Sequence, residues 1–355
     1  MAGRDKAADS PAGRAVRRVT MKDVAKRAGV SQPTVSFVLN DRRDVSVAPA
    51  TRERVLRAAK ELRFQPNRAA QSLRSNRSFL IGVIADGVVS QPYAGKIVLG
   101  VQQAVQSKGY VCFVVETLET PDRGRAAVER LIEEGVAGLV YAAAGAFPIE
   151  AVTTREQIPT VFVNCWPTDP DFTDPVIVLA DEYQGGRDAA EATFAAGHRH
   201  VVFLGGPEGD YACVERERGM VDAALAASID PGSIRREYGN YQVSSGHDLA
   251  MKVLADETPT AFICGNDRMA VGAMMAVQSS GLRCPGDVSI VGFDDQPDLA
   301  DQLHPGLTTV ALPHLQMGEL GGSLLVNGTE PEGRHLVPCR YIARESLAAP
   351  REDAR

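Results

Sequence analysis

The stretch TMKDVAKRAGVSQPTVSFVLN, residues 20–40, predicts two short helices joined by a tight turn. Thr20 and Asp23 have the spacing of a capping box, which would begin the first helix, and Gly29 supplies its stop. Ser31 can cap the second helix, which is rich in small polar side chains. A helix, a glycine-containing turn and a second helix make the helix-turn-helix pattern, which can place a helix in the major groove of DNA.

A third helix is predicted from Pro49 onward, because proline suits the first position of a helix, and it runs through TRERVLRAAKEL. Apolar residues recur at helical spacing through all three segments. We expect these residues to pack into one small core: Val24, Ala25, Ala28, Val35, Val38, Leu39, Val55 and Leu62.

Charge divides the chain into two unlike parts. Residues 1–78 contain 18 Lys and Arg against 7 Asp and Glu, a balance of +11. The other residues contain 20 against 38, a balance of −18, and together these give the net charge of −7. A basic amino-terminal part on an acidic remainder indicates that the first part binds a polyanion and the second does something else.

Bulk composition excludes several classes of protein. The six cysteines are scattered without a CxxC pair or a Cys/His ligand spacing, so we expect free thiols in a reducing compartment and no metal site. The amino-terminal residues contain no apolar signal segment, and the longest uncharged run, roughly residues 135–149, is too short to span a bilayer. We expect a cytoplasmic protein with no membrane contact and no cofactor.

From residue 79 the pattern changes to short apolar runs that alternate with helical segments. This alternation is typical of repeated βα units with parallel strands buried on both faces. The runs are FLIGVIA, VCFVV, GLVYAA, PTVFV, VIVL, HVVFLGG, TAFICG and DVSIVGFDD. Because these strands exceed one comfortable sheet, we expect two α/β lobes with a cleft between them, divided near the polar stretch WPTDPDFTDP.

The pattern T-x-x-D-V-A-x-x-A-G-V-S-x-x-T-V-S-x-V-L-N resembles the lac repressor/gal repressor family of bacterial transcription regulators. The resemblance continues through PNRAAQSLRS (66–75), CGNDRMAVGAM (264–274) and VGFDDQPDLADQLHPGLTTV (291–310), and covers roughly residues 20–346. It implies an all-α helix-turn-helix headpiece followed by a two-lobed core of parallel sheets, related in fold to periplasmic sugar-binding proteins.

Domain boundaries follow from the composition and from this resemblance. We expect a disordered leader over residues 1–18 and the DNA-binding headpiece over residues 19–65. A hinge helix and linker would occupy residues 66–78, and the two-lobed effector-binding and dimerisation domain residues 79–348.

The resemblance assigns Gln32, Pro33 and Phe37 to the base-reading positions of the second helix. Position 37 is usually Arg in this family, and Arg pairs with guanine. Phe37 can instead pack on a thymine methyl group or turn inward into the headpiece core, and the sequence leaves both open. The predicted DNA contacts are Thr20, Ser31, Gln32, Pro33, Thr34, Ser36, Phe37, Asn40, Asn67, Arg68, Ala70 and Leu73.

The hinge segment, residues 66–75, could form a helix that is too short to be stable alone. In the family, two such segments fold side by side on DNA, and the residue equivalent to Leu73 wedges into the minor groove. Ordinary packing of the leucine is the alternative.

Ligands of open parallel sheets bind beyond the carboxyl ends of the strands, where this chain has several polar and aromatic residues. The predicted effector-binding residues are Asp86, Tyr93, Asn164, Arg216, Tyr241, Asn266 and Asp294. Arg216 matches the family's R-x-x-G effector arginine, although a surface role is an alternative. Tyr93 and Tyr241 could instead pack the lobes, and Asp267 could cap the following helix.

We therefore expect a homodimeric regulator, a repressor, that binds a pseudopalindromic operator in double-stranded DNA. Its operator affinity would respond to a small polar ligand, a sugar or sugar derivative. Ala94, Cys165 and Leu312 depart from the family pattern, so a plain hexose is not assured. A non-sugar metabolite or a partner protein is the alternative signal, and a sugar-binding module without DNA function is a remoter one. No phosphate loop, GxSxG elbow or HExxH motif is present, so no enzyme is expected.

Overall fold

The computed structural model describes residues 19–40, 45–64, 78–91, 93–117, 121–152, 158–328 and 333–351 of the 355-residue chain. The chain divides into two compact units, Met1–Arg77 and Ser78–Arg355. The described part of the first unit is the headpiece, and the second unit is the core.

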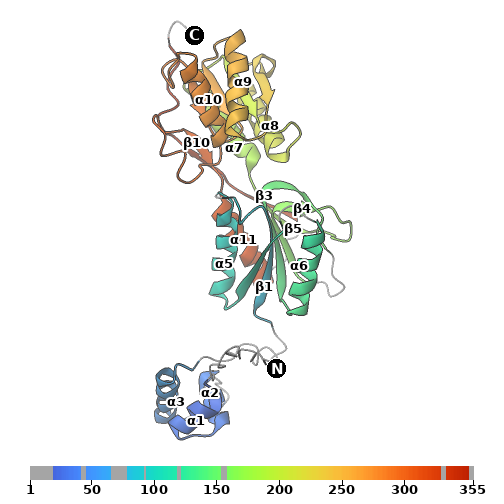
Figure 1. The fold of residues 1–355 in the computed structure, drawn as a ribbon, viewed down its shortest axis with the longest axis vertical. Helices are drawn as coiled ribbons and strands as arrows, with labels where there is room; N and C mark the ends of the chain where they lie inside the picture. Colours follow the sequence, from blue (N-terminus) through green and yellow to red (C-terminus); the bar gives the residue numbers. More distant parts are fainter. Residues whose placement is uncertain are drawn as a thin grey trace, which may run out of the picture. The chain divides into compact units, whose positions relative to one another are not determined.

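The headpiece consists of three helices, α1 (Met21–Ala28), α2 (Gln32–Leu39) and α3 (Pro49–Glu61), as predicted (Figure 1). The capping box at Thr20 is present, and Gly29 ends α1 in the left-handed conformation with φ 67°. Such a φ is strained for residues with a Cβ atom, which explains the glycine.

The predicted headpiece core is confirmed. Val24, Val35 and Val55 are fully buried, one from each helix, and Leu39 and Leu62 are partly buried against them. Ala58 and Ala59 of α3 join this core and were not predicted.

The core has an amino-terminal lobe built on a six-stranded parallel sheet with the strand order β11-β5-β4-β3-β1-β2. Alternate residues of each strand face opposite layers: Ile81 and Val83 pack with α5 and α11, whereas Ile84 packs with α6. Figure 1 shows α5 and α11 on one face of this sheet and α6 on the other. The elements are β1 (Leu80–Asp86), α5 (Gly95–Ser107), β2 (Val111–Glu116), α6 (Pro121–Glu133), β3 (Gly138–Ile149), β4 (Thr160–Pro167), β5 (Val176–Ala180), α11 (His314–Asn327) and β11 (Gly333–Val337).

The carboxyl-terminal lobe has a four-stranded parallel sheet with the order β7-β6-β8-β9, next to the antiparallel pair β10 and β12. Along β6, Val202 and Leu204 pack toward α9 and α10, while Val201 and Phe203 pack toward α7 and α8. The elements are α7 (Glu182–Ala195), β6 (Val201–Gly205), α8 (Tyr211–Ala226), the 3-10 helix Pro231–Ser233, β7 (Arg235–Tyr238), α9 (Val243–Asp256), β8 (Ala261–Cys264), α10 (Asp267–Ser279), β9 (Ser289–Val291), β10 (Thr309–Ala311) and β12 (Arg340–Ile342).

The predicted position of the lobe boundary is wrong. The stretch WPTDPDFTDP, residues 166–175, overlaps the end of β4 and leads to β5 of the same sheet. The chain first leaves the amino-terminal lobe after β5, where Asp181 caps α7. It returns between β10 and α11 and leaves again between β11 and β12. Polar composition marked a surface loop here and not a lobe boundary.

Glycines allow the helices to pack closely in pairs. A Cβ atom on Gly219 of α8 would lie 2.1 Å from the backbone oxygen of Tyr183 in α7, and one on Gly186 of α7 would lie 2.3 Å from that of Arg216. Gly246 and Gly272 play the same part between α9 and α10, as Gly100 and Gly318 do between α5 and α11. Among the described residues, no helix is long and apolar enough to cross a membrane.

Candidate DNA-binding face and effector cleft

Helix α2 presents its first turn to solvent. Gln32 and Pro33 are exposed, and Ser31 caps the helix by accepting a hydrogen bond from the backbone N–H of Thr34 at 3.3 Å. The Ser31 and Thr34 hydroxyls lie 2.8 Å apart. This polar turn, free of bulky side chains, has the form that a major-groove helix needs at its start.

The carboxyl end of α2 is held by Asn40, whose side-chain amide donates to the carbonyl oxygen of Ser36 at 2.8 Å and to its hydroxyl at 3.1 Å. Thr20 has a capping role, since its hydroxyl oxygen accepts a hydrogen bond from the backbone N–H of Asp23 at 3.3 Å. Several predicted DNA contacts therefore also stabilise helix ends. Asn67, Arg68, Ala70 and Leu73 of the predicted hinge lie outside the described residues.

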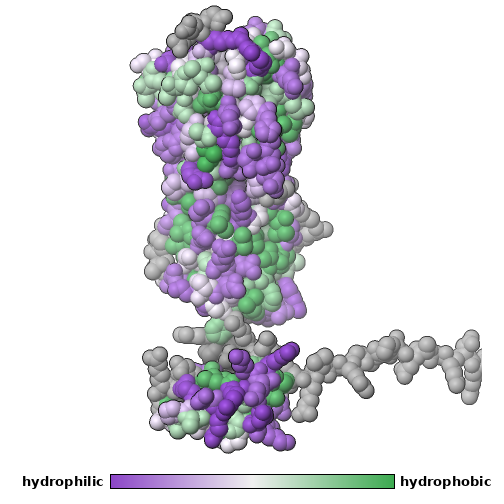
Figure 2. Space-filling view, turned by 90° about the vertical axis from the view of Figure 1, so that its left-hand side faces the viewer, coloured by the Kyte–Doolittle hydropathy of each residue, from purple (hydrophilic) through white to green (hydrophobic). Residues whose placement is uncertain are grey.

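Phe37 is half-buried and is not among the residues that pack on the headpiece core. Val35 and Val38, on the opposite face of α2, fill that core. This placement does not support the alternative in which Phe37 widens the headpiece core. On the face that Figure 2 shows, the described residues of the headpiece are largely hydrophilic.

Six of the seven predicted effector residues line one cavity between the two lobes of the core, here called the cleft. They come from both lobes and from elements far apart in the sequence. Lining residues from the predicted set are Tyr93, Asn164, Arg216, Tyr241, Asn266 and Asp294, and Glu182, Asp210, Ala212, Leu312 and His314 are among the others. The cavity itself holds about 100 Å³.

Arg216 of α8 is the buried centre of the cleft and not a surface arginine. Its Nε donates to Glu182 at 2.8 Å, and its Nη1 donates to the carbonyl oxygen of Gly265. Nη2 lies 3.9 Å from Asp294, and the guanidinium stacks 3.7 Å from the centre of the Phe293 ring. Burial would lower the pKa of Arg216, but the charges of Glu182, Tyr241 and Asp294 outweigh burial and raise it, so the group stays protonated.

The side chains of Asp294, beside this arginine, and of Asp267 in α10 are both buried. Burial raises the pKa of Asp294, although the guanidinium of Arg216 opposes the shift. Burial also raises the pKa of Asp267, and the nearby charge of Asp294 adds to it. The predicted capping role of Asp267 is wrong: Asn266 caps α10 by accepting from Met269 at 2.9 Å. Asp267 instead accepts a hydrogen bond from the Thr309 hydroxyl at 2.6 Å, which ties α10 to β10.

The two predicted tyrosines line the cleft and also pack its walls. Tyr241 donates to Asp210 at 2.8 Å, and burial raises the pKa of its phenol. The Tyr93 ring stacks with His314 at a centroid distance of 6.1 Å, and His314 Nδ1 lies 3.1 Å from the Tyr93 carbonyl oxygen. Because a carbonyl only accepts, Nδ1 carries the hydrogen and Nε2 is an acceptor in the neutral ring.

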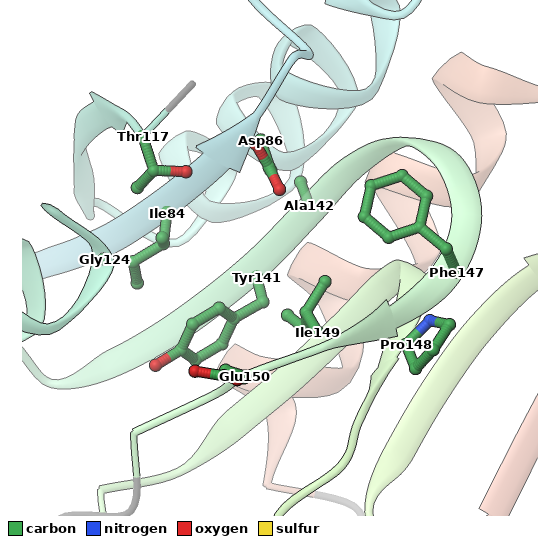
Figure 3. A pocket seen from close by; sticks show the side chains of 10 residues that line it. All are labelled: Ile84, Asp86, Thr117, Gly124, Tyr141, Ala142, Phe147, Pro148, Ile149 and Glu150. Carbon is green, nitrogen blue, oxygen red and sulfur yellow. The ribbon is translucent and has the colours of Figure 1, made fainter. Parts of the chain in front are cut away.

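Asp86 is separated from the other six predicted residues. It lines a second cavity of about 420 Å³ in the amino-terminal lobe, shown in Figure 3 with Tyr141, Phe147 and Glu150 among its neighbours. Asp86 does end β1 as expected. Beyond that strand end, the long strand β3 changes register between Ala142 and Phe147 and contributes Ala144, Gly145 and Ala146 to the cleft.

Glu182, Asp210 and His314 line the cleft and were not predicted. Asp210 has a recognisable signal, since it follows the glycine-rich turn after β6 and caps α8. Glu182 follows the β5 strand at the start of α7, a position equivalent to those that were predicted elsewhere. His314 has no local signal, because the chain returns to the first lobe there. Within the described residues, no group of His, Cys, Asp and Glu is placed to hold a metal ion.

Comparisons with known proteins agree with this arrangement. The profile of bacterial regulatory proteins of the lacI family matches residues 20–67, and that of the periplasmic binding protein-like domain matches residues 190–347. The HTH-type transcriptional repressor PurR of Proteus mirabilis (strain HI4320) is 34% identical over 340 residues, which cover 93% of this chain and 97% of that protein.

Solved structures show the same fold. The lac repressor dimer bound to operator and the anti-inducer ONPF has a TM-score of 0.75 at 29% identity, covering 94% of this chain and all of that one. The complex of the transcriptional regulator CelR with cellobiose has a TM-score of 0.61 at 28% identity, covering 93% and 100% of the two chains. The predicted fold class and family are thereby confirmed. This chain belongs to the lacI family of bacterial regulatory proteins and is a DNA-binding transcriptional repressor, not an enzyme.

Proposed function

We propose that this repressor is a homodimer that reads a pseudopalindromic operator and that a small polar effector in the cleft controls its operator affinity. The observation that carries the proposal is the meeting of six predicted effector residues around one cavity, in a unit separate from the helix-turn-helix. Effector binding would shift the population between two lobe arrangements, of which one allows two hinge segments to pair on DNA. Because its target is DNA, we place the protein in the cytoplasm.

Exposed apolar residues on the core support the homodimer. Strand β2 is an edge strand, yet Val111, Phe113 and Val114 of this strand are 41–47% exposed, and Leu99 of α5 is 46% exposed. Apolar patches on the amino-terminal lobe are visible in Figure 2. An apolar edge strand that is exposed to water can pair with a strand of another chain. We therefore propose that a second copy of this chain covers β2.

On DNA, we propose that Gln32, Pro33 and Phe37 face base edges and that Leu73 of the hinge enters the minor groove. Gln32 is the polar reader among the first three, since Pro33 and Phe37 offer no side-chain donor. The exposure of the first turn of α2 supports this assignment.

For the effector we propose a small metabolite, with a sugar or sugar derivative as one candidate. Carboxylates, amides and an aromatic face are the groups that bind vicinal hydroxyls and the C–H side of a sugar. CelR was solved with cellobiose. Leu312 and the Tyr93–His314 stack make one side of this cleft less polar, which favours a non-sugar metabolite as the second candidate.

The test measures binding of the full-length protein to genomic fragments at two salt concentrations, with and without a metabolite extract. Each neutralised phosphate contributes a slope of about −0.9 to the log–log salt dependence, so retention at low salt must fall steeply as salt rises. Specific fragments whose retention changes with extract support the proposal. Retention of no fragment, or retention that is insensitive to salt, contradicts it.

A further inference from the structure

Several side chains that line the cleft donate hydrogen bonds to the protein itself. Arg216 donates to Glu182 and Gly265, as described above, and Tyr241 donates to Asp210. The side-chain amide of Asn164 donates to the carbonyl oxygen of Ala143 at 3.2 Å, and that of Asn266 donates to Tyr241 at the same distance.

In the described part of the chain, each carboxylate that lines the cleft accepts hydrogen bonds on only one of its two oxygens. Among the described residues, the hydrogen bonds to the three lining carboxylates fall on one oxygen of each: Oε2 of Glu182, Oδ2 of Asp210 and Oδ2 of Asp294. The other oxygen of Asp294, Oδ1, lies 3.9 Å from Nη2 of Arg216, which is beyond hydrogen-bond distance. A cavity of this kind presents acceptors to a bound molecule.

The formal charge of the cleft also favours a ligand that donates hydrogen bonds. Three carboxyl groups and one guanidinium line the cleft, which leaves a charge of −2 when all are ionised. Arg216 and Glu182 are each about 5% exposed, so their charges are little screened by water. A ligand carboxylate or phosphate placed here would face three like charges, and the guanidinium that lines the cavity is already paired.

Three features could favour an anion, and none reverses this balance. Arg268 lies 5.4 Å from the centre of the Tyr93 ring, but its Nε already donates to Gln296 at 3.3 Å. Helices α7, α8 and α10 begin at or beside the cleft, but the side chains of Asp181, Asp210 and Asn266 already cap their first turns. Lys96 and Arg340 line the adjoining cavity of about 480 Å³, but both are exposed to solvent, where charge is screened.

We propose that the effector of this cleft is rich in hydrogen-bond donors and carries no net negative charge: a polyhydroxy or amino compound, not a carboxylate or phosphate ester. This inference rests on the proposed function, because it concerns the ligand of the same cleft.

The experiment separates a metabolite extract of the source bacterium by ion exchange at pH 7 into anionic, neutral and cationic pools. Each pool is added to the full-length protein, and the melting temperature and operator binding are measured. The neutral or cationic pool raises the melting temperature and changes operator binding. A response confined to the anionic pool overturns the inference and leaves ligand control intact. No response to any pool contradicts the proposed ligand control itself.

A pair of variants places the response in the cleft. Asp294→Asn keeps the shape and tolerates the positive φ of 112° at this position, but removes the charged acceptor. It raises the amount of the active pool needed for half the response by about 10- to 100-fold, since hydrogen bonds to charged groups are the stronger ones. Asp298→Asn makes the same charge change at an exposed position and leaves the response unchanged. An unaltered response in Asp294→Asn overturns the assignment.

Discussion

Arg216 shows how one residue acquires its role from its partners. A guanidinium that is 6% exposed is stable only because Glu182, Asp294 and the Gly265 carbonyl surround it, and it in turn permits those carboxylates to be buried. The group therefore holds α7, α8 and the loop after β8 together at the cleft.

Replacing Arg216 by Ala leaves Glu182 and Asp294 buried without a counter-charge. We expect the core to lose about 3–5 kcal/mol of stability and the effector response to disappear, while the headpiece, a separate unit, retains its fold. Denaturant unfolding measures the first effect. Arg218→Ala is the matched control, because Arg218 lies on the same helix with its side chain 60% exposed, and its loss changes stability little. Equal stability of the two variants would contradict the buried role.

His314 makes the core sensitive to acid. Burial lowers the pKa of His314 to about 4, below the usual value of about 6.5. The unfolded chain therefore binds a proton here before the folded chain does, so stability is full above pH of about 6.5 and is lost as pH falls toward 4. In His314→Phe, which keeps an aromatic ring beside Tyr93, this loss should shrink by up to about 3 kcal/mol. Unfolding at pH 7.5, 5.5 and 4.5 measures the difference between the proteins, and a constant difference would rule the effect out.

At the scale of elements, paired glycines set the geometry of the cleft. Contact between the backbones of α7 and α8 brings Glu182, at the start of α7, to Arg216 in α8. The ion pair thus depends on two residues without side chains.

Gly219→Ala should separate α7 from α8, because the added Cβ atom would lie 2.1 Å from the backbone oxygen of Tyr183. A backbone oxygen cannot rotate away as a flexible side chain can. We expect a loss of about 1–3 kcal/mol and a weakened effector response. Gly124→Ala in α6 is the control, since its Cβ atom would make an ordinary contact at 3.9 Å with Thr117. Thermal unfolding of both variants measures the contrast, and similar curves would reject the close-packing argument.

Helix α2 carries the prediction on operator sequence. Phe37→Arg places a bidentate donor on the face that we assign to DNA, so the preferred site should acquire a guanine at the opposed position. Selection of binding sites from random DNA, with wild type in parallel, measures this shift. Circular dichroism is the control for folding: an unfolded headpiece would instead place Phe37 in its core.

At the scale of the whole molecule, the proposed function predicts two copies in one operator-binding assembly, because a single recognition helix reads only half of a pseudopalindromic site. We propose that the exposed apolar residues of β2 make this contact.

Phe113→Lys introduces a charge on the exposed edge strand β2 and should turn the dimer into a monomer, with at least about tenfold weaker operator binding. Analytical ultracentrifugation and operator titration measure the two effects. Leu225→Lys is the control, since Leu225 of α8 is 59% exposed in the other lobe. A dimer that survives the first change would place the interface elsewhere.

Local signals predicted much of this molecule. The three headpiece helices and their caps depend on residues three or four apart, which a sequence displays directly. Eight apolar runs became β1–β6, β8 and β9, because strands buried on both faces are apolar throughout. The edge strand β2 is the exception, since it is apolar but its residues Val111, Phe113 and Val114 are exposed. The strands that were missed, such as the charged edge strand Arg235–Tyr238, have no such signal.

The sequence by itself therefore determined the headpiece, the α/β character of the core and six of the residues that line the cleft, because strand ends of parallel sheets converge at one edge. Only the tertiary structure decided which side chains contact one another in the cleft. Glu182 meets Arg216 across 34 residues, and His314 meets Tyr93 across 221. Asp86, although it ends a strand, lies in another cavity because β3 changes register beside it. Such pairings arise from the packing of distant segments, which no local spacing encodes.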